Sequence, residues 1–147
     1  MTNLSFYAIP VYYSLTMIPH AYATLMMKKA NNGRWNNASP NSTAWVESLR
    51  KSTPADVFSR YERAKACHRN GMENFPLFVG AVLAGNLAKL DTNVFVVGYL
   101  LSRVAYTLAY INISNPKISY IRSIFWNVGA LWCMWIFVKS GLAMTEK

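Results

Sequence analysis

The stretch Leu4–Met27 (LSFYAIPVYYSLTMIPHAYATLMM) contains no Asp, Glu, Lys or Arg. Its 24 residues exceed the roughly 20 that an α-helix needs to cross the hydrocarbon core of a bilayer. Pro10 and Pro19 interrupt the stretch, but membrane helices tolerate proline because neighbouring groups satisfy the freed backbone. Since the stretch lacks the basic start and the cleavage site of a signal peptide, we expect a retained transmembrane helix.

Three further segments have the composition of membrane helices. They cover residues 71–90, 92–113 and 118–138. The first of these is the weakest, because its uncharged part, Asn74–Ala88, has only fifteen residues. It spans a bilayer only if Asn70 and Glu73 also enter the membrane zone. The sequence therefore predicts an all-α integral membrane protein, with residues 1–147 forming a single domain, a bundle of four transmembrane helices.

Composition and charge agree with a membrane location. Hydrophobic residues make up 53% of the chain and charged residues only 14%, against roughly 25% in soluble domains. Nine of the fifteen Lys and Arg residues lie between positions 28 and 69, where three acidic residues leave a net charge of +6. Because the positive charge is clustered beside membrane segments, we expect no nucleic-acid partner. The positive-inside rule predicts a cytoplasmic loop at 28–53 and termini on the lumenal side.

A new helix is predicted to begin just after this loop. Thr53 can cap its first turn, Pro54 suits that turn, and Asp56 complements the helix dipole. The pattern stays compatible with a helix to about Leu90.

Charged residues at membrane depth identify a candidate site. A charge at the centre of a membrane helix costs on the order of 2.5 to 3.5 kcal/mol on insertion scales. Glu73, Arg103 and Arg122 occupy such positions or their edges, so we expect Glu73 and Arg103 to be internal. The structural alternatives are a Glu–Arg pair without a function, or an Arg122 that extends to the membrane surface.

Helical spacing adds hydrogen-bonding groups to two of these charges. Asn70 and Glu73 share one helix face, and Arg103 shares another with Tyr106 and Tyr110. Exposing either polar face to lipid would cost free energy, whereas contact between the two faces would satisfy their polar groups. We therefore expect the two faces to meet and to bind a small zwitterionic peptide. The alternative for the tyrosines is an aromatic belt at the membrane interface.

No metal site is expected. His20 and His68 lack partner ligands, and Cys67 and Cys133 lie far apart without metal-type spacing.

Three motifs carry a family resemblance. Residues 62–76 (ERAKACHRNGMENFP) resemble the second-helix signature of the MAPEG family, the membrane-associated proteins in eicosanoid and glutathione metabolism. Residues 103–110 (RVAYTLAY) are similar to the third-helix signature, and residues 122–126 (RSIFW) resemble the start of the fourth helix. The resemblance covers three of the four expected helices in matching order. In character it is closest to fungal-type members.

The resemblance implies a homotrimer in the endoplasmic reticulum membrane, with glutathione as co-substrate between subunits near the cytoplasmic face. It implies a glutathione transferase, peroxidase or isomerase, acting on a lipophilic small molecule in contact with membrane lipid. The residues that it assigns to glutathione binding are Asn70, Glu73, His68, Arg69, Arg103, Tyr106 and Tyr110. It assigns catalytic roles to Arg122, beside the glutathione thiol, and to Tyr110.

Two other functions stay open. Ala66 stands where the eicosanoid-forming members carry an arginine, which favours a non-catalytic lipid-binding protein. An isomerase or cyclase could use the same cavity without glutathione. The retained Arg103, Tyr110 and Arg122 favour the glutathione-dependent enzyme.

The basic loop yields a topology prediction. A Ser42→Cys variant in sealed microsomes should react with an impermeant maleimide added on the cytoplasmic side, because the +6 segment retains the loop there. The unsubstituted chain controls for Cys67 and Cys133. Labelling that requires access to the lumen would reverse the orientation.

Overall fold

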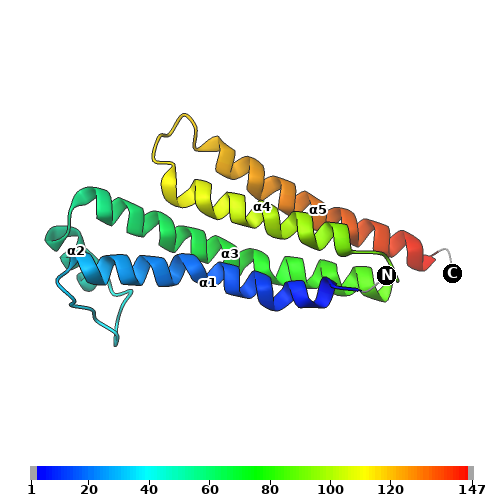
Figure 1. Cartoon of the computed structure of the whole chain (residues 1–147), viewed down its shortest axis with the longest axis horizontal. Helices are drawn as coiled ribbons and strands as arrows, with labels where there is room; N and C mark the ends of the chain where they lie inside the picture. Colours follow the sequence, from blue (N-terminus) through cyan, green and yellow to red (C-terminus); the bar gives the residue numbers. More distant parts are fainter. Residues whose placement is uncertain (1–2, 146–147) are drawn as a thin grey trace.

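The computed structural model describes residues 3–145, which form five helices and no strand. The helices are α1 (Ser5–Ala30), α2 (Thr43–Ser52), α3 (Ala55–Leu87), α4 (Asn93–Asn112) and α5 (Tyr120–Thr145). The four long helices lie side by side in one elongated bundle, and the short α2 packs at one end (Figure 1). The all-α prediction is confirmed, and each predicted membrane segment overlaps one long helix.

Two helices, α4 and α5, are long and apolar enough by themselves to cross a membrane. The 20 residues of α4 rise roughly 30 Å, the thickness of the hydrocarbon core. Among the described residues, α1 and α3 do not meet the same measure of length and hydropathy. The α3 helix is long because its charged first half and its apolar second half form one continuous element of 33 residues. Four complete spans therefore stay a prediction.

The structure corrects the predicted start of α3, because a separate helix, α2, lies within the expected loop and ends just before α3. Ser42 caps α2, since its side chain accepts a hydrogen bond from the Trp45 amide. Thr53 ends α2, and its hydroxyl donates to the Leu49 carbonyl at 2.8 Å. The residue before α3 is Pro54, with no side-chain cap. The prediction that Thr53 caps α3 is wrong, because its hydroxyl hydrogen-bonds to the preceding helix, α2.

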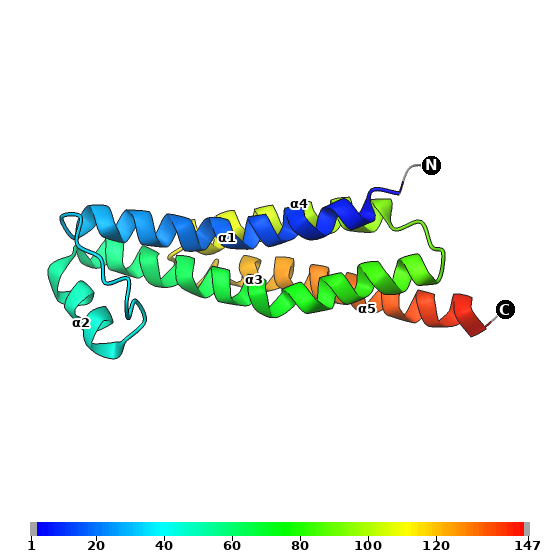
Figure 2. The ribbon, with the colours of Figure 1, turned by 90° about the horizontal axis from the view of Figure 1, so that it is seen from below.

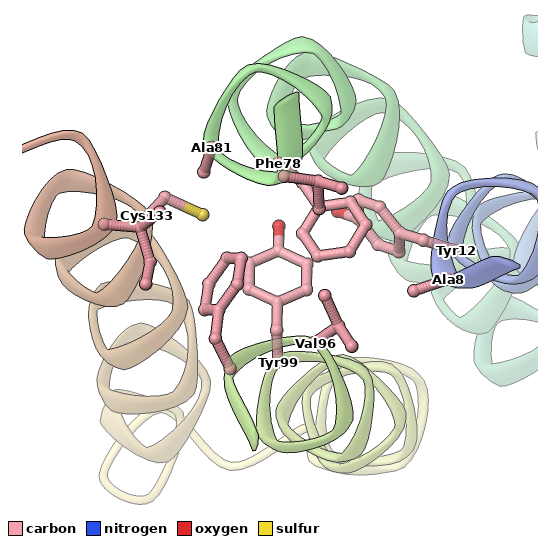
Figure 3. Close-up of a cluster of buried hydrophobic side chains, with 10 residues drawn as sticks. Ala8, Tyr12, Phe78, Ala81, Val96, Tyr99 and Cys133 are labelled. Atoms are coloured by element: carbon pink, nitrogen blue, oxygen red, sulfur yellow. The ribbon is translucent and has the colours of Figure 1, made fainter. Parts of the chain in front are cut away.

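An aromatic cluster holds the middle of the bundle together. Tyr99 stacks on Phe78 with ring centroids 4.3 Å apart, and Tyr12 meets both rings edge-on at 5.1 Å (Figure 3). Cys133 on α5 is fully buried beside these rings. The cluster therefore ties all four long helices together.

A second apolar cluster joins α2 to the bundle end. Leu49 of α2 is fully buried with Met27 of α1 and Phe58 of α3. The end of α1 and the start of α3 extend past the connection between α4 and α5, and α2 packs there (Figures 1 and 2). The basic loop thus folds back on the bundle instead of extending away from it.

Large apolar side chains cover much of the outer surface of α5. Leu131 is 66% exposed and Trp135 is 53% exposed, and Ile124 and Leu142 are exposed to a similar degree. Soluble monomers rarely expose contiguous apolar surface of this kind. A lipid environment or a neighbouring subunit accounts for it.

Candidate functional site

A polar cavity of about 430 Å³ lies where α3, α4 and α5 meet, which is within the roughly 300–1,000 Å³ typical of small-molecule sites. Its lining combines three helices with the turn before α5. The lining residues are Asn70, Glu73, Tyr106, Tyr110, Ser119, Arg122, Ser123, Trp126 and Asn127. Five of the residues predicted from the sequence are therefore brought together here.

The α3 and α4 sides of the cavity are joined by a hydrogen bond. The Asn70 side-chain amide donates to the Tyr106 hydroxyl at 2.9 Å. The Tyr106 ring lies 5.3 Å from that of Tyr110, one helical turn further along α4. This bond confirms that the two polar helix faces meet, as the spacing of Asn70 and Tyr106 predicted.

Glu73 opens into this cavity from α3 and is exposed within one chain. The prediction that Glu73 is internal is wrong for the single chain, because Glu73 is exposed where it lines the cavity. Both ion pairs among residues 3–145 involve Arg50, so the Glu73 carboxylate forms none there. Its charge is available to a ligand or to another subunit.

The α5 side of the cavity contributes a single cation, Arg122. Its Nε donates to the Ser119 carbonyl at 3.4 Å, and its guanidinium lies 4.6 Å from the centre of the Tyr110 ring. The chain turns after Pro116 and α5 begins at Tyr120. This turn brings Arg122 close to Tyr110 near the end of α4. One carboxylate and one guanidinium therefore face the same polar space.

Arg103 is internal, as predicted, but it lies outside the cavity lining. Only 4% of its surface is exposed. Its Nη2 donates to the carbonyl oxygens of Phe125 and Trp126, at 3.2 and 3.1 Å. The guanidinium also lies 4.7 Å from the Tyr99 ring and 5.6 Å from the Tyr106 ring. Within one chain, Arg103 thus contacts α5 and not the polar space.

His68 and Arg69 also lie away from this cavity. The Nδ1 of His68 is 2.8 Å from the Thr16 carbonyl oxygen, so this side chain faces α1. Arg69 lines a second hollow of about 550 Å³ between α3 and the α2 region, together with Lys65. Burial and the nearby Arg69 guanidinium lower the pKa of Lys65. The cations of this hollow therefore repel each other.

The two histidines lie together without a third ligand. The ring centroids of His20 and His68 are 4.9 Å apart. Within the part of the chain that the structure describes, no group of three or more His, Cys, Asp or Glu side chains is placed to hold a metal ion.

Four cavity residues on α5 or just before it were not predicted from the sequence. They are Ser119, Ser123, Trp126 and Asn127. The same spacing rule that was applied to α3 and α4 finds Trp126, since it lies four residues after Arg122 on one helix. Ser119 precedes α5, and the irregular turn after Pro116 gives no helical period that would place it.

An all-α bundle with two membrane-capable helices, an exposed apolar surface on α5 and a polar cavity is compatible with a helical membrane protein. A comparison with protein-family models supplies the family: the MAPEG family model matches residues 6–142. The chain therefore belongs to the MAPEG family, a family of glutathione-related membrane proteins that are mostly glutathione-dependent enzymes. No curated protein and no solved structure matches the chain.

Proposed function

We propose that the protein is a glutathione-dependent enzyme that acts on a lipophilic electrophile, by conjugation, peroxide reduction or isomerisation. The observation that carries the proposal is the placement of Glu73 and Arg122, which open into one polar cavity from two helices. A negative side chain from α3 and a positive side chain from α5 suit a zwitterionic ligand. Family membership supports glutathione as that ligand.

The lining residues fit part of glutathione well. The tripeptide has an amino group, two carboxylates and a thiol. Glu73 would hold the amino group, and Asn70 and Tyr106 would supply hydrogen bonds to the peptide. Arg122 is the single cation of the lining, so the ligand's carboxylates need a further cation. A neighbouring subunit of the expected homotrimer would bring one, and the outward-facing Glu73 is compatible with a site completed there.

Arg122 is the residue that we assign to the chemistry. A free thiol with a pKa of about 8.5 is only a few per cent thiolate at neutral pH. A guanidinium stays protonated at that pH, so Arg122 would favour the thiolate and the thiol proton would pass to water. The sulfur electron pair would then form the bond to the electrophilic atom of the substrate, while the electrons of the bond that breaks leave with its other partner.

Tyr110 would support Arg122. Its ring lies 4.6 Å from the guanidinium, and such a contact restricts the arginine without removing its charge. Since the Tyr110 ring also contacts that of Tyr106, the same side chain links Arg122 to the peptide-binding wall. We therefore retain Tyr110 as the second residue of the proposed catalytic pair.

The position of the cavity suits a membrane substrate and a water-soluble thiol. The cavity is lined by residues beside the turn that connects α4 and α5, and this turn points toward the bundle end that carries α2 and the basic loop (Figure 1). We propose that this end faces the cytoplasm, with the protein in the endoplasmic reticulum. Glutathione would enter from the cytoplasm. The lipophilic substrate would come from the lipid that surrounds the exposed apolar face of α5.

A lipid-binding protein without thiol chemistry is the second candidate. Ala66 and the single cation of the lining favour it, because fewer positive groups hold the ligand's carboxylates. A glutathione-independent isomerase or cyclase would use the same cavity. Glutathione binding and the effect of substituting Arg122 distinguish these two candidate functions from the first proposal.

Glutathione affinity tests the role of Glu73. Replacing Glu73 by glutamine should weaken binding at least tenfold, roughly 1.4 kcal/mol, because a neutral amide keeps the shape and loses the attraction to the amino group. Glu62→Gln removes the same charge from the same helix outside the cavity and should leave the affinity unchanged. The affinities are measured by calorimetry on the purified oligomer. If both variants bound glutathione as tightly as the unsubstituted protein, Glu73 would not belong to the site.

Turnover tests the role of Arg122. Arg122→Ala should reduce turnover at least a hundredfold and glutathione affinity much less, because the contact strengthens as negative charge localises on sulfur. Arg122→Lys should restore little, since a compact ammonium does not reproduce the planar guanidinium. Lys117→Ala removes an exposed cation from the same region as a control. Near-normal turnover in both Arg122 variants would contradict the proposal.

A further inference from the structure

Gly129 of α5 lies directly against the guanidinium of Arg103. A Cβ atom built on Gly129 would overlap Nη2 of Arg103. Gly141, further along the same helix, has open space where its Cβ would be. Of these two positions, only position 129 therefore needs to lack a side chain because of a neighbouring residue.

The absence of a side chain at Gly129 uncovers two carbonyl groups. A helical side chain covers the turn that precedes its own Cα, and the carbonyls of that turn belong to Phe125 and Trp126. These two oxygens accept the hydrogen bonds from Nη2 of Arg103, at 3.2 and 3.1 Å. Any larger residue at position 129 would stand between the donor and its acceptors.

The charge of Arg103 makes this contact important for the bundle. No ion pair among residues 3–145 involves Arg103, whose surface is 4% exposed. The two carbonyl oxygens and the faces of Tyr99 and Tyr106 are the negative partners that surround the guanidinium. Hydrogen bonds to an ionised donor are stronger in a low dielectric, and a buried cation that loses them is costly.

The contact lies within the last turn of the part of α5 that lines the cavity, which extends to Asn127. Arg122 and Trp126 occupy the first two turns of α5, and the chain before them is an irregular turn. The two carbonyls that Arg103 contacts lie near the end of this section. Asn70, Glu73 and Tyr106 come from other helices, so the α5 wall could shift while the opposite wall stays in place.

We propose that Gly129 and Arg103 are positioning residues, a clamp that fixes the first two turns of α5 and thereby sets where Arg122 stands in the cavity. The clamp itself is independent of the ligand, and its effect on turnover rests on the proposed glutathione-dependent function. Arg103 acts through the α5 backbone. Gly129 acts by leaving room for the guanidinium.

Hydrogen exchange tests the clamp without any substrate. In Gly129→Ala, amides of residues 120–126 should exchange at least tenfold faster, because the added methyl group displaces the guanidinium from both carbonyls. Residues 135–145 of the same helix should be unaffected, and Gly141→Ala should change neither region. Arg103→Met, which keeps a long flexible side chain but no donor, should accelerate residues 120–126 in the same way even if Gly129→Ala does not fold.

The double variant decides whether Gly129 acts through Arg103. Adding Gly129→Ala to Arg103→Met should change exchange of residues 120–126 by less than twofold, because the displaced group is already gone. An undiminished effect of Gly129→Ala in that background would overturn the clamp, as would unchanged exchange in the single variants.

Kinetics then test the link to Arg122. Gly129→Ala should lower turnover at least tenfold and change glutathione affinity less than threefold, because the α3 and α4 wall keeps its groups. General damage to the fold would lower both. Faster exchange with normal turnover would overturn the positioning role. If the unsubstituted protein shows no glutathione turnover, the proposed function fails, and the exchange results still decide the clamp.

Discussion

The interaction on which the site depends is the one between the buried guanidinium of Arg103 and the backbone of α5. An arginine inside an apolar bundle is acceptable only where hydrogen-bond acceptors surround it. Here Gly129 exposes two carbonyl oxygens that serve this purpose. The same constraint explains the cavity, because Asn70 and Tyr106 satisfy each other across two helices. The polar groups of Arg103, Asn70 and Tyr106 are therefore satisfied by contacts between helices.

Much of this arrangement could be predicted from the sequence. Long apolar stretches determine the number and approximate bounds of the long helices, because the length of a membrane helix follows from bilayer thickness. Spacing of three and four residues placed Asn70 beside Glu73 and Tyr106 beside Tyr110, and all four line the cavity. The predicted segment 118–138 and the MAPEG resemblance both place Arg122 near the start of the last helix, and the structure has it in the first turn of α5, where it lines the cavity.

Other features could not be predicted, for identifiable physical reasons. Arg103 was expected at the ligand, but its partners are backbone carbonyls, which leave no trace in a side-chain pattern. The one indication was Gly129, a small residue facing Arg103 across two helices, and a single glycine is too common to interpret. The α2 helix was missed because its ten residues lie in a segment rich in Asn, Ser and Pro. Its apolar face becomes visible only when Leu49 is seen against α1 and α3.

The central claim is that this cavity binds glutathione as the thiolate, held by Arg122. Calorimetric titration of the purified oligomer at pH 7, repeated in buffers with different ionisation enthalpies, measures the protons released on binding. Because a free thiol is mostly protonated at this pH, thiolate binding should release about one proton per bound glutathione, whereas S-methylglutathione should bind and release none. Absence of binding, or binding of both peptides without proton release, would contradict the claim.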